Sequence, residues 1–130
     1  CAHTVTMNCA PFEVLADPVA LEQIIHNLLT NALQAMEQVP PQGRTLQLVL
    51  THTATHGVLQ VQDSGPGIPP DALVKVFEPF FSTREGGLGL GLSLCETLAV
   101  GMGARLSAAN RTPHGAEFTL QIPLAHAAAA

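Results

Sequence analysis

One long amphipathic helix is predicted between residues 18 and 38. Asp17 can cap its first free N–H groups, and Pro18 fits the first helical position. The Pro40-Pro41 pair ends the pattern. A helix with one apolar face must bury that face against another layer of structure. The apolar side chains that recur at intervals of three and four are Leu21, Ile24, Ile25, Leu28, Leu29, Ala32 and Met36.

Short segments that alternate apolar and polar residues are predicted to form that second layer. Two further helices are expected, a short one around residues 71–76 and another over 92–102. Strands separated by three helices predict an α/β sandwich, with the helices on one face of a mixed sheet. The expected strands are residues 4–8, 46–50, 59–63, 106–108 and 116–122.

Composition excludes several classes of protein. The chain has 130 residues, so it can form one domain, and its net charge of −5 argues against binding to a nucleic-acid backbone. The only lysine, Lys75, follows no glycine loop, which excludes a Walker A motif. We expect one domain over residues 1–124, a flexible tail over 125–130, and an origin in a longer protein because the chain begins at Cys1. Its three cysteines form no CxxC pair and favour a reduced, cytosolic setting.

Asp63 is the sharpest candidate for chemistry. It shares a strand face with Leu59 and Val61, so its carboxylate is expected to point toward the core, where it needs hydrogen-bond donors. One interpretation is a capping residue satisfied by the amides of the following loop. The other is a carboxylate that awaits a neutral donor from a ligand, such as an exocyclic amine. Gly65 and Gly67 would let a ligand ring lie close to the backbone.

Asn27 and Asn31 lie one helical turn apart at the border of the apolar face. Half-buried amides need partners, and the simplest partners are neighbouring backbone groups. Two such amides beside a cleft could instead present their oxygens to Mg²⁺, which takes oxygen ligands.

A second glycine run, residues 86–91, leads directly into the last predicted helix. Loop N–H groups and a helix N-terminus together favour an anion such as phosphate. Arg84, one of only five basic residues, precedes the run, although a solvated surface arginine is the simpler interpretation. Phe77, Phe80 and Phe81 lie between the two glycine loops and either belong to the core or anchor a hinge. The histidines show no metal-ligand spacing.

In this order, five segments resemble the motifs of the ATP-binding catalytic domain of sensor histidine kinases. The resemblance covers about residues 17–123 and is strongest to the nitrogen-regulation and C4-dicarboxylate sensor kinases. It implies the α+β fold shared with gyrase B, the heat-shock chaperone ATPase and the mismatch-repair ATPase: a two-layer sandwich whose mixed sheet is mostly antiparallel, with three helices on one face. The matching segments are the N box (21–36), the first glycine box (63–68), the F box (76–84), the second glycine box (87–92) and the closing glycine box (115–118).

The resemblance implies ATP and Mg²⁺ as cofactors. Asp63 would accept a hydrogen bond from the adenine amino group, Asn31 with Asn27 would hold Mg²⁺, and Arg84 would reach the terminal phosphate. Asn31 and Arg84 are thereby the expected catalytic residues. The remaining residues expected around the nucleotide are Gly65, Gly67, Ile68, Phe77, Gly87, Leu88, Gly89, Leu90, Gly91 and Leu92.

Two departures bear on function. Leu88 stands where the family commonly has Thr or Ser, which removes a hydroxyl contact to phosphate. Asn27 stands where the ATP-hydrolysing relatives carry a Glu that activates water, and an amide cannot act as a general base. We therefore expect a histidine kinase rather than an ATPase or an anti-sigma-type serine kinase, and a non-catalytic nucleotide-binding module is the other alternative.

The resemblance also implies partners and location. The implied partners are a dimerisation domain, which carries the phosphoacceptor histidine that this chain lacks, and a response-regulator receiver domain. No nucleic acid and no direct membrane contact are expected. The domain would be cytoplasmic, and whether the parent protein is anchored in the inner membrane stays open. This interpretation fails if protein groups already saturate both carboxylate oxygens of Asp63.

Overall fold

The computed structural model describes residues 2–7, 14, 17–73, 75–78 and 91–125. Its elements follow one another in the order expected for a sandwich of strands and helices. In chain order they are β1 (Ala2–Met7), α1 (Pro18–Ala35), the 3₁₀ helix η1 (Pro41–Gly43), β2 (Thr45–His52), β3 (His56–Asp63), α2 (Pro70–Leu73), α3 (Gly91–Gly101), β4 (Arg105–Asn110) and β5 (Ala116–Pro123).

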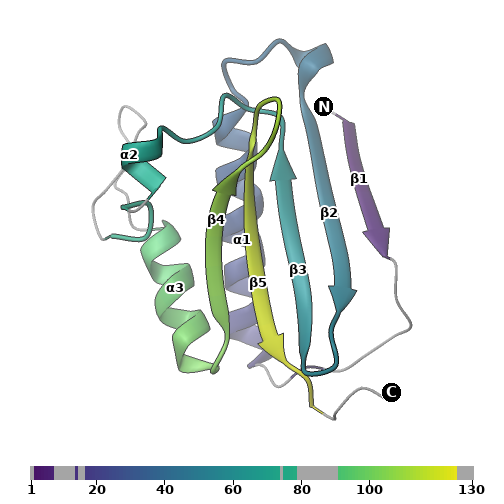
Figure 1. Cartoon of the computed structure of the whole chain (residues 1–130), viewed down its shortest axis with the longest axis vertical. Coiled ribbons are helices and arrows are strands. Elements are labelled where there is room, and N and C mark those ends of the chain that lie inside the picture. The colour runs from purple at the N-terminus through teal and green to yellow at the C-terminus, as the bar shows by residue number, and fades with distance from the viewer. Residues whose placement is uncertain (1, 8–13, 15–16, 74, 79–90, 126–130) are drawn as a thin grey trace.

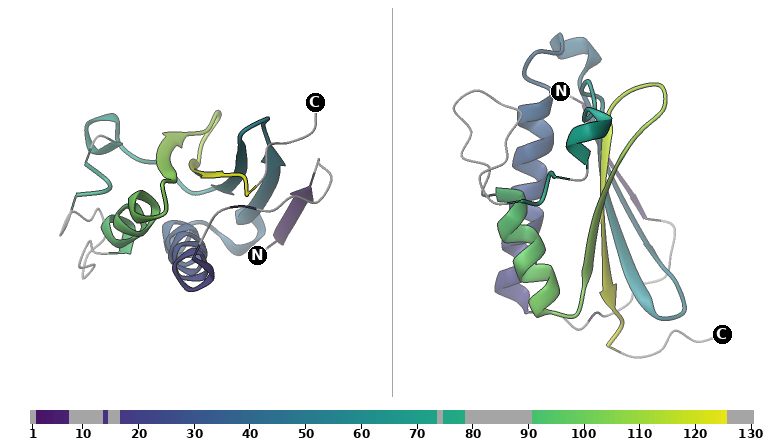
Figure 2. Two further views of the ribbon diagram at one scale, coloured as in Figure 1. Left: turned by 90° about the horizontal axis from the view of Figure 1, so that it is seen from below. Right: turned by 60° about the vertical axis from the view of Figure 1, so that its left-hand side comes forward.

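The strands form one sheet in the order β1-β2-β3-β5-β4 (Figure 1). β1 pairs with β2 in parallel, and every other neighbouring pair is antiparallel. Helices α1 and α3 lie side by side over one face of this sheet (Figure 2). The predicted two-layer α+β sandwich with a mixed, mostly antiparallel sheet is therefore confirmed. Among the described residues, no helix combines the length and the apolar character needed to cross a membrane.

Helix α1 begins as the sequence indicated. The Asp17 carboxylate accepts hydrogen bonds from the N–H groups of Val19 at 2.9 Å and Ala20 at 3.4 Å. The helix ends at Ala35, three residues before the expected end at 38. Beyond it, the Arg44 guanidinium donates to the carbonyls of Glu37 at 2.9 Å and Val39 at 2.6 Å. These hydrogen bonds satisfy carbonyl groups of the turn that replaces the last predicted helical residues. Because Arg44 lies beyond the helix, the apolar pattern of the helix could not predict them.

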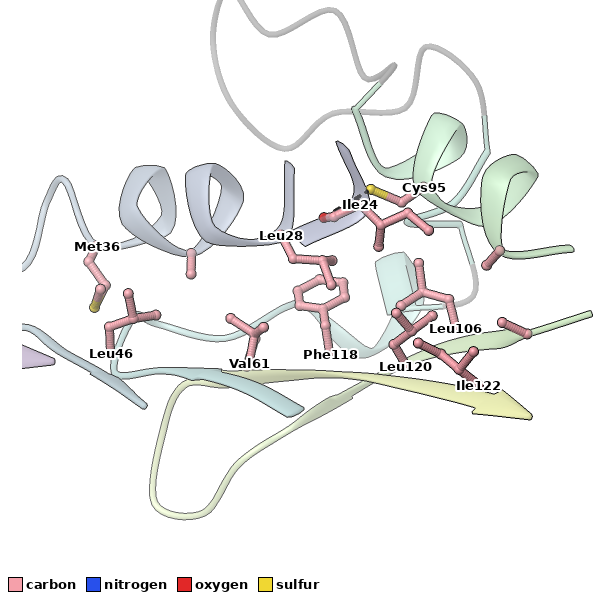
Figure 3. Close-up of a cluster of buried hydrophobic side chains, with 14 residues drawn as sticks. Ile24, Leu28, Met36, Leu46, Val61, Cys95, Leu106, Phe118, Leu120 and Ile122 are labelled. Atoms are coloured by element: carbon pink, nitrogen blue, oxygen red, sulfur yellow. Dashed lines mark hydrogen bonds between the residues drawn. The ribbon is translucent and has the colours of Figure 1, made fainter. Parts of the chain in front are cut away.

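The core lies between the two layers (Figure 3). Phe118 and Leu120 of β5 and Ile24 and Leu28 of α1 are almost fully buried, and each such side chain contributes about 1.5–3 kcal/mol by leaving water. Cys95 of α3 is buried among them, and burial raises the pKa of its thiol. The core therefore fixes α1 and α3 against β3 and β5, the strands that carry the candidate site.

The prediction for the short helix was wrong in its bounds. It was expected around 71–76, but α2 spans Pro70–Leu73 and residues 75–78 form turns. The N–H groups of Lys75 and Glu78 donate to the carbonyls of Ala72 and Lys75, both at 2.9 Å, and these contacts three residues apart form turns in place of a longer α-helix. Strand β4 is longer than its predicted 106–108, whereas α3 and β5 begin within one residue of expectation.

Candidate functional site

Asp63 is the last residue of β3, and its side chain is 1% exposed. Its Oδ1 accepts hydrogen bonds from the backbone N–H groups of Gly65 at 2.9 Å and Ala116 at 3.2 Å. The strand pairing explains the second contact, because Gln62 lies opposite Glu117 and this places the start of β5 beside the end of β3. The expected inward orientation is confirmed, and the loop-amide interpretation holds for one of the two oxygens.

The second carboxylate oxygen of Asp63 differs from the first. Within the described part of the chain, no hydrogen bond reaches Oδ2, whereas every fully buried side-chain oxygen or nitrogen there has a partner. Oδ2 is therefore the oxygen of Asp63 that can still accept from a ligand, and because the whole residue is 1% exposed, only a small part of this oxygen reaches the surface. Burial raises the pKa of Asp63, an effect opposed by the two backbone N–H donors and by the nearby charge of Arg111.

Arg111 was not among the candidate residues. It follows β4, and its Nη1 donates to the backbone carbonyl of Asp63 at 3.1 Å. The sequence shows no basic residue close to Asp63, but the pairing of β5 with both β3 and β4 brings Arg111 beside it. The closing glycine motif at Gly115, only four positions later, was the one signal that pointed to this turn.

Two glycines after Asp63 have no room for a side chain. A Cβ on Gly65 would lie 2.9 Å from the Ala35 carbonyl oxygen and 3.0 Å from Asp63 Oδ1. Gly67 has a φ of +86°, in the left-handed region that favours glycine. The next residue, Ile68, is half-buried and packs against the core. The loop therefore passes close to the end of α1 and to the Asp63 carboxylate, and the space in front of these two glycines is filled by protein atoms.

Asn27 connects the two helices. Its Nδ2 donates to the carbonyl of Gly91, the first residue of α3, at 3.4 Å, and its Oδ1 accepts from Gln23 Nε2 at 2.9 Å. Asn31 lies one turn further along α1 and is half-buried. Amide oxygens are hard donors that fit Mg²⁺, but the Asn27 oxygen already accepts one hydrogen bond. The assignment of both asparagines to Mg²⁺ stays a prediction.

The second glycine run leads into α3 at Gly91, as predicted. The half-buried Leu92 packs against the core, and Phe77 meets Phe118 edge-on with ring centroids 6.3 Å apart. Phe77 is thus a residue at the core's margin. The remaining predicted residues of this region lie outside the described part of the chain, so their roles stay predictions: Phe80, Phe81, Arg84, Gly87, Leu88, Gly89 and Leu90.

Clusters of the usual metal-binding side chains do not account for the site. In the described ranges, no three His, Cys, Asp or Glu side chains come together in a way that could hold a metal ion.

Comparison with known proteins assigns almost the whole chain to one protein family. Residues 16–126 match the family described as "Histidine kinase-, DNA gyrase B-, and HSP90-like ATPase". The C4-dicarboxylate transport sensor protein DctB of Pseudomonas aeruginosa is 42% identical over 116 residues, which are 87% of this chain and 19% of DctB. The chain thus spans about a fifth of the length of this relative.

Solved structures agree. The catalytic domain of the histidine kinase ThkA, in a nucleotide-free form, is 29% identical with a TM-score of 0.82, covering 94% of this chain and 78% of that one. ThkA in complex with the response regulator TrrA gives 28% identity and a TM-score of 0.77, covering 93% and 33%. Full-length ShkA in complex with AMPPNP gives 30% identity and a TM-score of 0.82, covering 98% and 26%.

The Asp63 carboxylate, the glycine loop behind it and the asparagines of α1 thus occur in a chain that matches an ATP-binding family over nearly its full length. The chain belongs to the family of histidine kinase-, DNA gyrase B- and HSP90-like ATPases.

Proposed function

We propose that this domain binds Mg-ATP and transfers the γ-phosphoryl group to a histidine on a separate dimerisation domain. The observation that carries the proposal is the half-satisfied carboxylate of Asp63, whose Oδ1 is fixed by two backbone donors while Oδ2 can accept another. The adenine amino group is a neutral donor of the right kind for it. ShkA, which was solved with the ATP analogue AMPPNP, supports the same ligand class.

The residues of the chain divide the work of the reaction. Asp63 would orient the base, and Gly65 lets the loop pass close to the Asp63 carboxylate while Gly67 lets it pass close to Asn110. Asn31 would contribute an amide oxygen to Mg²⁺, which supplies charge neutralisation along the triphosphate when it is bound. Arg84 would stabilise the terminal phosphate, and the glycine run 87–91 would hold the phosphate chain at the start of α3. Phosphoryl transfer depends mostly on such positioning and charge neutralisation.

Asn27 favours transfer to a protein over hydrolysis. Its amide is hydrogen-bonded to Gln23 and to Gly91, so it supports the α1–α3 contact. An amide has no basic site that could activate water. The lone domain is therefore expected to bind ATP without releasing phosphate at a steady rate.

The partner in the proposed reaction is a helical dimerisation domain, and the next acceptor is a response-regulator receiver domain. The complex of ThkA with TrrA supports this type of partner. The similarity to DctB supports a sensor kinase of the C4-dicarboxylate type, and we place the reaction in the cytoplasm.

The test is a transfer assay with labelled ATP and a matching dimerisation domain. We expect a phosphoprotein that is labile to acid and stable to base, as a phosphohistidine is, and no label when the acceptor histidine is replaced. Absence of label under conditions in which ATP binds would favour the non-catalytic module. Steady phosphate release by the lone domain would favour an ATPase.

A further inference from the structure

Asn110 makes two opposed hydrogen bonds to one residue of the glycine loop. It ends β4, and its Oδ1 accepts from the Ile68 N–H at 2.7 Å while its Nδ2 donates to the Ile68 carbonyl at 2.6 Å. A side-chain amide that bonds both groups of one residue replaces the contacts that a neighbouring strand would make. Ile68 is therefore held in one orientation by a residue 42 positions away.

The rest of the β4–β5 turn contacts the same loop. Arg111 donates to the Asp63 carbonyl at 3.1 Å, and His114 Nδ1 lies 3.3 Å from the Gly65 carbonyl oxygen. The turn is closed by a hydrogen bond from the Arg111 N–H to the Gly115 carbonyl at 2.8 Å. The β4–β5 turn thus contacts the glycine loop where the loop begins, at Asp63 and Gly65, whereas Asn110 holds the far end of the loop at Ile68.

Gly67 shows how closely the two segments approach. A Cβ at this position would lie 2.9 Å from Asn110 Oδ1 and 3.2 Å from the Gly115 carbonyl oxygen. The loop from 64 to 69 has no regular secondary structure, and its two glycines leave it more backbone freedom than other residues would. External hydrogen bonds must therefore supply the order that a purine-binding surface requires.

We propose that Asn110 is a positioning residue that sets the selectivity of the site for adenine. It acts through Ile68 and Gly67, so that the loop presents one surface to the base while Asp63 Oδ2 accepts from the amino group. The proposal rests on the proposed function. When the loop is released, contacts to the triphosphate persist, but the base no longer lies in register with Asp63.

The experiment compares ATP with inosine triphosphate, in which a carbonyl oxygen replaces the adenine amino group. Calorimetric titration gives both affinities for the unaltered chain, Asn110→Ala, Asn110→Asp and the control Ser107→Ala. Ser107 is exposed on the same strand, and its side chain has no hydrogen bond among the described residues. Asn110→Asp keeps the acceptor for the Ile68 N–H but sets an oxygen against the Ile68 carbonyl.

We expect the unaltered chain and Ser107→Ala to prefer ATP. Asn110→Ala should weaken ATP binding about tenfold, as the loss of two hydrogen bonds implies, and leave inosine triphosphate nearly unchanged. Asn110→Asp should likewise lose the preference. Its carboxylate is close in shape to the amide, so it provides a second variant if Asn110→Ala does not fold.

An equal loss of both affinities, or no loss, would overturn the proposal, and so would failure of both variants to fold, because Asn110 would then be structural. If the unaltered chain binds both nucleotides equally, there is no selectivity for Asn110 to set and this proposal fails; if it binds neither, the proposed function fails instead.

Discussion

Asp63→Asn separates ligand binding from folding. Asparagine has nearly the same shape, so its Oδ1 can accept the same hydrogen bonds from Gly65 and Ala116. Its Nδ2 then lies where Oδ2 was and turns a donor toward the adenine amino group. The complex loses one hydrogen bond to a charged acceptor and gains a donor–donor mismatch. ATP binding should weaken by about 2–3 kcal/mol, a factor of about 30–150.

The same variant should be no less stable than the unaltered chain at neutral pH. Burial raises the pKa of Asp63, so the folded protein binds this proton more tightly than the unfolded chain does. That favourable contribution is present below the unfolded pKa and is lost as the pH rises through the raised folded value. Above the unfolded pKa, the burial of this group therefore lowers the stability of the folded state, and the neutral amide removes this effect together with the weaker attraction to Arg111.

Calorimetric titration with ATP and thermal unfolding followed by circular dichroism measure the two effects. Because the chain has no Trp or Tyr, the intrinsic fluorescence of those residues cannot report on binding or unfolding, and neither of these two assays needs it. The matched control is Asp71→Asn, which removes the same charge at an exposed position of α2. An Asp63→Asn variant that binds ATP as tightly as the control refutes adenine recognition by Asp63. A variant that unfolds at a much lower temperature refutes the reasoning on its buried charge.

Four further outcomes are expected. Asn31→Ala should abolish the Mg²⁺ dependence of ATP affinity, and persistence of that dependence in titrations with and without Mg²⁺ would place the ion elsewhere. Arg84→Ala should reduce the rate of phosphotransfer more than ATP affinity; the reverse order would contradict a role at the terminal phosphate. ATP affinity should fall as the pH falls through the raised pKa of Asp63, because the protonated carboxyl no longer accepts from the amine, and Asp63→Asn, measured in parallel, should lack this component. Phe118→Ala should lower the free energy of unfolding by about 3–5 kcal/mol, measured by denaturant titration, and a loss below about 1 kcal/mol would mean that this ring does not anchor the core.

Local patterns predicted the framework of the site. The spacing of apolar residues in α1, with its Asp17-Pro18 start, fixed which face of the helix is buried. Alternation in β3 placed the Asp63 side chain inward, and the structure confirms both predictions. These features were accessible because helical and strand periodicity are local properties of the chain.

Contacts between distant segments were not accessible in this way. Asn110 and Arg111 reach the Asp63 loop only because β5 pairs with both β3 and β4, and strand order is a property of the whole sheet. Likewise, α1 ends before its apolar pattern does, where the Arg44 side chain satisfies carbonyls of the following turn. The spacing of apolar residues within a helix does not indicate that a side chain from beyond its end will fold back onto it.

Titration of the unaltered domain with ATP, once with Mg²⁺ and once with a chelator, tests the central claim most directly. We predict one nucleotide bound per chain with Mg²⁺ and a clearly weaker affinity without it. No measurable binding of ATP in the presence of Mg²⁺ would contradict the assignment of this site.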